Sequence, residues 1–333
     1  MIKFSGAPLL LSLLALLFVL YPPHTASAQV TAQAESSQAV EWTSRGVQHV
    51  HGLPDAKPKD KGTLTLSAAG LSFTGKTSRA MIPRQAVTAV SAGNQRVEIW
   101  GMKGQILRAV IPNGGGVAAA MVMHHRVDML TVEFVDEKGG YHGAVFFLPA
   151  KEATRALESF SKTPYLVREP QSNTCRRPDI WPNSVLLAAP NWDQTQVPAA
   201  YRALVYERLY DRLRQEKAVH RVYRDGENNA QQACPEYTIQ ISISGFKQGN
   251  QVKRAVLGPV GFFVGTTQMK FDATVTDASG KVKMHEQITA TVRGETESTN
   301  VATSVAKKLA KHYAAMLKAT GESNPAALTP RQL

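Results

Sequence analysis

The chain has 333 residues, of which 43% are hydrophobic, and a formal net charge of +12. This length and apolar content exclude wholesale disorder and indicate one large domain or two ordinary ones. The basic residues are dispersed, which is typical of a solvated surface. Tyrosines alternate with arginines over 201–224, but these tyrosines are needed for the core face of a helix, so we expect no nucleic-acid binding.

Residues 1–28 have the pattern of a secretory signal peptide. A basic start is followed by an apolar run from Ala7 to Tyr21, which is shorter than the ~20 residues that span a membrane. Ala26-Ser-Ala28 is a small-x-small cleavage sequence. We therefore expect cleavage after Ala28 and export to the periplasm or another part of the cell envelope, with an uncleaved N-terminal anchor as the alternative.

The chain has two cysteines, Cys175 and Cys234. In an exported protein an even pair predicts one disulfide, and their spacing fits no zinc motif. On the chain-entropy model, closing a loop of this length stabilises the fold by about 4 kcal/mol.

Residues 29–60 are rich in Gln, Ala, Ser and Lys, which predicts a flexible leader. Residues 61–162 read as a β-rich unit in which apolar and polar residues alternate. Asp136–Gly140 is a hairpin turn, and 151–160 reads as a closing helix with Ala153, Ala156, Leu157 and Phe160 on its inner face. The expected strands are 63–67, 71–74, 79–82, 86–91, 97–100, 106–111, 129–135 and 144–148. This order predicts a small antiparallel barrel whose mouth is plugged by one helix.

The layout of this unit is carried by six short stretches: Gly62–Leu66, Gly70–Phe73, Ile82-Pro83, Val87–Val90, Leu130–Phe134 and Ala144–Leu148. It resembles the pleckstrin-homology/GRAM-like domains of bacteria. The resemblance implies protein or lipid binding without chemistry. Where such domains bind phosphoinositides, the loop joining the first two strands is basic. Here we take that loop to be Ser67–Gly70, which is neutral and does not support phosphoinositide binding.

Residues 163–183 are polar and punctuated by proline, which predicts a linker. The second domain, 184–320, is expected to open with a strand at 184–190 and a helix at 198–217. Strands at 219–223 and 237–244 follow, then a hairpin turning at Asp277–Gly280 and a helix at 299–318. We expect an α+β domain with an antiparallel sheet and two helices, and a disordered tail at 321–333.

The residues that characterise this half are Tyr206–Leu209, Val222–Arg224, Tyr237–Ile241, Gly258–Gly265 and Phe271–Lys281. They resemble the family known as domain of unknown function 4410, which is found in exported bacterial proteins. That resemblance implies an exported protein and a fold. It implies no activity, because none is established for the family.

Two local clusters could bind a metal. His49-x-His51 would place two imidazoles on one face of a strand, and His124-His125 precedes Asp128 by three residues. Neither has the spacing of a known metalloenzyme motif, so we expect no metal, no other cofactor and no catalytic residue. His142, after the hairpin turn, is interpreted as a surface residue.

Phe262 and Phe263 lie in the Gly-punctuated run Val256–Gly265. Adjacent residues of a strand point to opposite faces, so one ring could form an apolar surface for a partner, while burial of both rings is the alternative. We expect a non-catalytic cell-envelope protein that acts as an interaction or assembly module, with protein partners, self-association or an anionic membrane surface as its contacts. The alternatives are an exported metal-dependent hydrolase that uses His49, His51, His124 or Asp128, and a carrier of lipid or another hydrophobic ligand.

Overall fold

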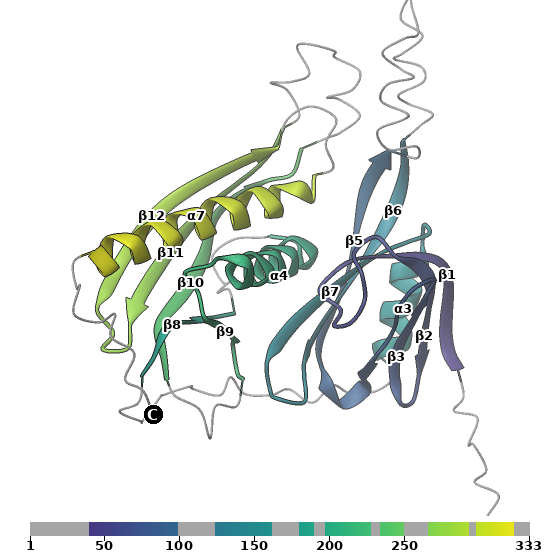
Figure 1. The fold of residues 1–333 in the computed structure, drawn as a ribbon. Coiled ribbons are helices and arrows are strands. Elements are labelled where there is room, and N and C mark those ends of the chain that lie inside the picture. The colour runs from purple at the N-terminus through teal and green to yellow at the C-terminus, as the bar shows by residue number, and fades with distance from the viewer. Residues whose placement is uncertain are drawn as a thin grey trace, which may run out of the picture. The chain divides into compact units, whose positions relative to one another are not determined.

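The computed structural model describes residues 40–98, 124–161, 180–189, 197–227, 234–249, 266–292 and 298–322. These residues belong to one compact unit, 38–333. They form an α+β fold with two sheets, a seven-stranded N-terminal sheet and a five-stranded C-terminal sheet (Figure 1). Within these ranges, none of the helices is both long and apolar enough to cross a bilayer.

The N-terminal sheet is antiparallel, in the order β4-β3-β2-β1-β7-β6-β5. A short 3₁₀ helix, η1 (Arg84–Ala86), joins β4 to β5, and α3 (Glu152–Ser161) follows β7 and packs against β1, β5 and β6. Antiparallel strands and a closing helix are confirmed for the described residues of this half, while the strand expected at 106–111 lies outside them. The pairing found is that of an open sheet with edges β4 and β5. Its strands are β1 (Val40–His51), β2 (Lys61–Ser67), β3 (Gly70–Gly75), β4 (Arg79–Pro83), β5 (Val87–Glu98), β6 (His124–Val135) and β7 (Tyr141–Leu148).

The alternation of apolar and polar residues gives this sheet a buried face. In β2 and β3 the apolar residues Leu64 and Leu66 face Phe73 and Leu71 across the register, and all four are buried. Together with Phe146, Phe160 and the inner residues of β6, they form a core between the sheet and α3.

The flexible leader expected over 29–60 is wrong for residues 40–51, which form β1 between β2 and β7. Trp42 and Val47 are buried in the core, and Trp42 Nε1 donates a hydrogen bond to Glu152 Oε2 at 3.2 Å. The extra strand shifts the count, so the loop between the first two strands is 52–60 and not Ser67–Gly70.

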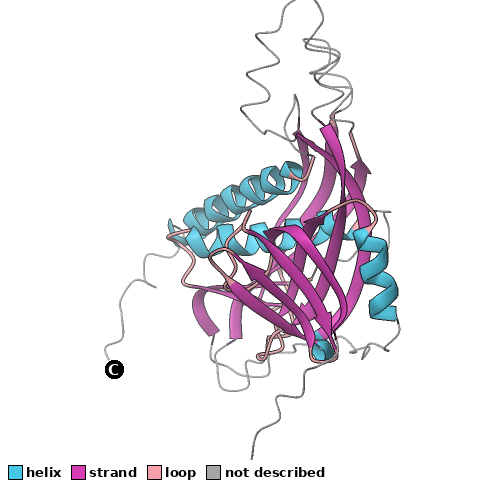
Figure 2. Ribbon diagram, turned by 90° about the vertical axis from the view of Figure 1, so that its right-hand side faces the viewer, coloured by secondary structure: helices cyan, strands magenta, loops and turns pink. Residues whose placement is uncertain are grey.

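The C-terminal sheet has the order β12-β11-β10-β8-β9 and is covered by two helices that pack against each other, α4 (Ala199–Gln215) and α7 (Asn300–Glu322) (Figures 1 and 2). The expected antiparallel pairing is confirmed for β10, β11 and β12, whereas β8 runs parallel to both β9 and β10. The chain passes through α4 between β8 and β9, and such a crossover returns the chain parallel to the strand it left. The strands are β8 (Ile180–Leu187), β9 (Arg221–Arg224), β10 (Cys234–Lys247), β11 (Thr267–Asp277) and β12 (Val282–Val292).

The hairpin of β11 and β12 is confirmed, with its turn at 277–281. Met269, Phe271, Ala273 and Val275 of β11 are all buried under the helices, as the alternation predicts. On α7 the apolar stripe of Val301, Val305, Leu309 and Tyr313 is buried, and Met316 of the same stripe is partly buried against this core.

The core under α4 also contains side chains of the N-terminal sheet. Val50, Met129, Val145 and Phe147 belong to the same buried cluster as Leu204 and the inner residues of the C-terminal sheet. The two halves therefore share a hydrophobic core. Of the expected linker at 163–183, residues 180–183 are the start of β8.

Candidate functional site

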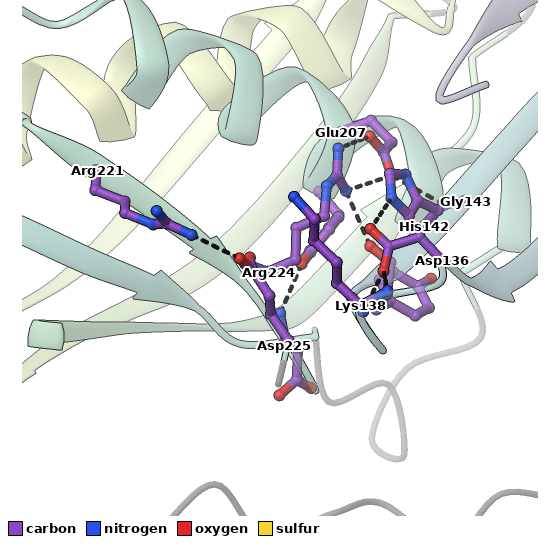
Figure 3. Close-up of polar contacts among 12 residues, drawn as sticks. Asp136, Lys138, His142, Gly143, Glu207, Arg221, Arg224 and Asp225 are labelled. Carbon is purple, nitrogen blue, oxygen red and sulfur yellow. Dashed lines mark hydrogen bonds and ion pairs between the residues drawn. The ribbon is translucent and has the colours of Figure 1, made fainter. Parts of the chain in front are cut away.

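A cleft of about 450 Å³ lies beside the shared core. Its walls are the loop after β1, the hairpin joining β6 to β7, and α4 with the end of β9. Four ionisable residues at its inner end, Asp136, His142, Glu207 and Arg224, form what we call the polar cluster (Figure 3).

Glu207 and Arg224 are the centre of the polar cluster. Their side chains are bonded in bidentate fashion, with Nη1 to Oε1 at 2.9 Å and Nη2 to Oε2 at 2.8 Å. Relative exposure is 2% for Glu207 and 7% for Arg224. Burial alone would lower the pKa of Arg224, but the Glu207 carboxylate raises it above its ordinary value. The guanidinium therefore stays charged.

The same two side chains bind the backbone of β7. Glu207 Oε1 accepts the Gly143 N–H at 2.9 Å, and Arg224 Nη1 donates to the Tyr141 carbonyl at 2.9 Å. The Tyr141 N–H in turn donates to the Asp225 carbonyl at 2.8 Å. The ion pair thus connects β7 of the N-terminal sheet to β9 of the C-terminal sheet and to α4, which covers that sheet.

His142 was expected at the surface but is only 6% exposed. Its ring stacks on Phe134 with centroids 5.0 Å apart. Nε2 lies 3.2 Å from Asp136 Oδ2, and Nδ1 lies 3.7 Å from Glu207 Oε1. The Asp136 carboxylate also accepts the N–H groups of Lys138 and Gly140, so it shapes the hairpin turn that presents His142 to the cluster.

Gly143 sets the distance between β7 and α4. A Cβ atom at this position would lie 2.5 Å from Ala203 Cβ, which is closer than packed carbon atoms approach. The small residues at both positions let the helix approach the strand closely enough for Glu207 to reach the Gly143 N–H.

The expectation that His49 and His51 share one face is wrong. His49 pairs with Phe146 and His51 with Val145, so two residues of β1 correspond to one of β7. This bulge changes the alternation and sends the two rings to opposite faces. His51 Nε2 meets Asp211 Oδ2 of α4 at 2.9 Å, whereas the His49 ring lies in the N-terminal core between Phe73 and Phe146.

His49 holds the loop 52–60. The Leu53 N–H donates to Nε2 at 3.1 Å, so the proton of the neutral ring is on Nδ1, which lies 3.1 Å from the Lys57 carbonyl. Burial lowers the pKa of His49 below its ordinary value, which keeps the ring neutral in this role. His49 is therefore a structural residue.

The other candidate residues are not brought together. Asp128 is buried, and its Oδ2 accepts the Ala153 N–H at 3.3 Å at the start of α3, so it acts as a cap. His124 lies at the start of β6. In the described part of the chain, no group of three His, Cys, Asp or Glu side chains could hold a metal ion.

Three further predicted residues lie outside the described residues: Phe262, Phe263 and Cys175. Cys234 is buried at the start of β10. Its pairing with Cys175 stays a prediction.

Sequence patterns alone did not identify Glu207 or Arg224 as site residues. The available signal was a carboxylate beside Tyr206 and one turn after Ala203, within the apolar stripe of α4. A charged side chain on the buried face of a helix needs an oppositely charged partner. For Glu207 that partner is Arg224 of β9, and the spacing of the two residues in the sequence does not reveal the pair.

One family model matches part of the C-terminal half. Residues 189–292 match the model described as "Domain of unknown function (DUF4410)", which confirms the resemblance stated for this half. The N-terminal sheet lies outside that match, so its resemblance to pleckstrin-homology/GRAM-like domains stays a prediction. No match is found among curated proteins.

Among solved structures, the PelC dodecamer from Paraburkholderia phytofirmans is 19% identical, with 39% of this chain and 86% of that chain covered and a TM-score of 0.29. A Xanthomonas campestris protein of the DUF330 family is 12% identical, with 44% of this chain and 91% of that chain covered and a TM-score of 0.26. Both likenesses are too slight to support an inference about this chain.

Proposed function

We propose that this chain is a non-catalytic, exported cell-envelope protein that acts as an interaction or assembly module. The observation that carries the proposal is the use of the polar cluster: its buried carboxylate and guanidinium bind each other and the backbone of β7. These are the groups a reaction would need, and they fasten two sheets into a single body instead.

A catalytic acid or base has to meet its substrate within hydrogen-bond distance and exchange a proton with it. Glu207 already accepts three hydrogen bonds from Arg224 and Gly143. Breaking such a buried pair costs about 3–5 kcal/mol. Glu207 is therefore poorly suited to exchange a proton with a substrate and well suited to hold the two sheets together. A rigid body that presents fixed surfaces is what an assembly partner requires.

Export is proposed from the signal-peptide pattern of residues 1–28, with cleavage after Ala28. The Cys175–Cys234 disulfide belongs to the same proposal, since an exported protein meets oxidising conditions. Residues 189–292 match the DUF4410 model, and the resemblance to that family implies an exported protein, so the match supports the proposed export.

A pleckstrin-homology/GRAM-like barrel for the N-terminal half is a further part of the proposal. Seven antiparallel strands followed by a helix that packs on their inner face support it. Interaction without chemistry is what that resemblance implies.

The two alternatives receive less support. A metal-dependent hydrolase that relies on His49 and His51 would need their rings to converge, and they point to opposite faces of β1. A lipid carrier would need space inside the N-terminal sheet, where Leu64, Phe73, Phe146 and their neighbours pack together.

Native mass spectrometry of residues 29–333, purified gently from the envelope fraction, tests the proposal. We expect a mass without metal or small ligand, as a single chain or in a defined assembly, and two daltons below the reduced mass because of the disulfide. Crosslinking in the intact envelope then identifies the protein partner. A stoichiometric metal or small molecule on the purified chain would overturn the non-catalytic assignment.

A further inference from the structure

Three exposed hydrophobic side chains lie at one end of the C-terminal sheet, where the adjacent residues Ile180 and Trp181 project from opposite faces of β8. Ile180, Trp181 and Val282 are 47%, 44% and 53% exposed. Only two other large hydrophobic side chains are exposed in the described ranges, Val40 and Met81, and both belong to the N-terminal sheet.

The strand register brings these residues to the same end. Ile180 and Trp181 begin β8 and pair with the first residues of β10, while Val282 begins β12 directly after its turn from β11. Because Tyr237 pairs with both Val185 and Asp277, the start of β8 and the β11–β12 turn lie at the same end of the sheet. Two strands lie between them, which is roughly 15 Å across the sheet at ~4.8 Å per strand, and the register places Trp181 three residues further towards this end than Val282. Figure 1 shows these ends together at the lower left of the sheet.

The last turns of α7 reach the same end. Tyr313 of α7 contacts Tyr237 of β10 with ring centroids 6.1 Å apart and an edge-on geometry. Lys318, five residues later, is exposed. We call the set of Ile180, Trp181, Lys281, Val282 and Lys318 the sheet-end patch.

The patch is basic as well as apolar. Lys281 and Lys318 are exposed and make no ion pair with the residues that the structure describes. Among the nearby carboxylates, Asp277 pairs with Lys283 at 3.1 Å and Glu236 accepts the backbone Asn183 N–H at 2.6 Å, so the lysines Lys281, Lys283 and Lys318 outnumber these two carboxylates. Hydrogen bonds from Ser279 and the turn lower the pKa of Asp277, so it remains an internal counter-charge.

We propose that the sheet-end patch binds the surface of an anionic lipid bilayer. Tryptophan is favoured at the membrane–water interface, where its ring meets the acyl boundary and its N–H meets water, and the two aliphatic side chains add apolar area. Lysines held beside such an anchor are attracted to anionic headgroups. Binding is peripheral, with the patch in the headgroup region and the rest of the protein in water.

A second copy of the chain is the competing occupant, and the charges argue against it. A symmetric dimer through the patch would bring Lys281 and Lys318 of both copies into one interface in which lysines outnumber carboxylates. Like charges facing each other oppose association. An anionic bilayer supplies the missing negative charge.

This inference goes beyond the proposed function and does not depend on it, because a lipid surface is recognised whether or not the protein also has a protein partner. The test is flotation of residues 29–333 with vesicles of about three parts phosphatidylcholine to one part phosphatidylglycerol, compared with vesicles of phosphatidylcholine alone. We expect binding to the anionic vesicles, and its loss at about 0.5 M salt because exposed charges are then screened.

Two patch variants separate the apolar and basic contributions. Ile180→Ser with Trp181→Ser should weaken binding by about tenfold or more through the lost apolar area. Lys281→Gln with Lys318→Gln should weaken it by roughly fivefold per lysine and abolish the preference for anionic lipid. The matched controls are Met81→Ser for the apolar pair, and Lys247→Gln with Lys307→Gln for the lysines, since these residues are exposed elsewhere. Circular dichroism and urea unfolding verify that each variant is folded.

Retained binding in both controls together with loss in both patch variants supports the proposal. It is overturned by equal binding to neutral vesicles, by no binding, or by equal losses in controls and patch variants. It is also overturned if the chain forms a dimer that Trp181→Ser dissociates while the anionic vesicles leave the protein unbound, because a second copy then covers the patch.

Discussion

Replacing Glu207 by Gln removes the negative charge from the polar cluster while keeping the side chain's shape. The amide oxygen can still accept the Gly143 N–H, but the bidentate pair with Arg224 is lost. Arg224 is then a buried cation without a counter-ion, stacked 3.7 Å above the Tyr210 ring.

The expected cost is about 3 kcal/mol for Glu207→Gln and about 4–5 kcal/mol for Glu207→Ala, which also leaves the Gly143 N–H unbonded. Either is a large fraction of the ~5–15 kcal/mol that stabilises ordinary proteins. Replacing both partners by apolar residues, Glu207→Leu with Arg224→Met, should cost less than the sum of the single changes, because neither variant side chain leaves an unpaired charge.

Urea unfolding measures these free energies, and hydrogen exchange at Gly143 and Tyr141 reports the junction directly. In Glu207→Ala we expect faster exchange at both amides and separate unfolding of the two sheets, because the ion pair is a main polar contact between them. A cost below about 1 kcal/mol for Glu207→Gln, or additive single changes, would refute the view that the pair fastens the sheets.

Three further predictions concern the loop after β1 and the packing of α4. Burial lowers the pKa of His49, so the folded protein resists protonation there, and stability that is complete above the ordinary value of 6.5 is lost as the pH falls below it. His49→Gln should lack this acid-sensitive component in urea unfolding and allow trypsin to cleave after Lys59 at neutral pH; an unchanged pH profile would contradict the role of the ring. Hydrogen bonds from Ser78 and Thr77 lower the pKa of Asp60 to about 2 from 3.8, so its contribution is present above pH 3.8 and is lost as the pH falls towards 2. Asp60→Asn should flatten the thermal-stability profile in that window, and parallel profiles for both proteins would count against it. Gly143→Ala should destabilise by about 1–3 kcal/mol through overpacking against Ala203, and Ala203→Gly should restore part of the loss in the double variant; strictly additive effects would show that the two positions do not meet.

Local patterns were sufficient for most elements of the fold. The alternation in 267–292 and the Asp277 turn predicted the β11–β12 hairpin, because each side of that sheet has a distinct environment: the helices cover Phe271, and water covers Lys270. The helices were equally predictable, since apolar residues that recur every 3.6 residues form one face of an α-helix.

Pairing between distant strands was not predictable in the same way. Residues 40–51 follow a polar stretch, and their alternation is interrupted by bulges near Gly46 and Val50, so the segment resembled a leader. Its role as the strand between β2 and β7 depends on partners found 13 to 99 residues later, which periodicity does not encode.

The histidines show the same limit at the level of single side chains. Spacing alone placed His49 and His51 on one face, which made a metal site conceivable. One extra residue in β1 reverses that relation: it puts His49 into a core where it must be neutral and His51 against a carboxylate of α4. A bulge of one residue therefore decides between a ligand pair and two unrelated structural contacts, and it depends on tertiary packing.

The junction between the sheets follows from the same reasoning and limits how the protein can work. Gly143, Glu207 and Arg224 come from three elements, and each is required by the position of the other two. Glu207 and Arg224 are buried and charged. Separating the sheets would therefore expose apolar side chains of the shared core and break a buried ion pair, and both changes cost free energy. Small relative movements of the sheets are therefore costly, and contacts made by the far end of the C-terminal sheet, where Trp181 lies, are transmitted to the N-terminal sheet as movements of one body.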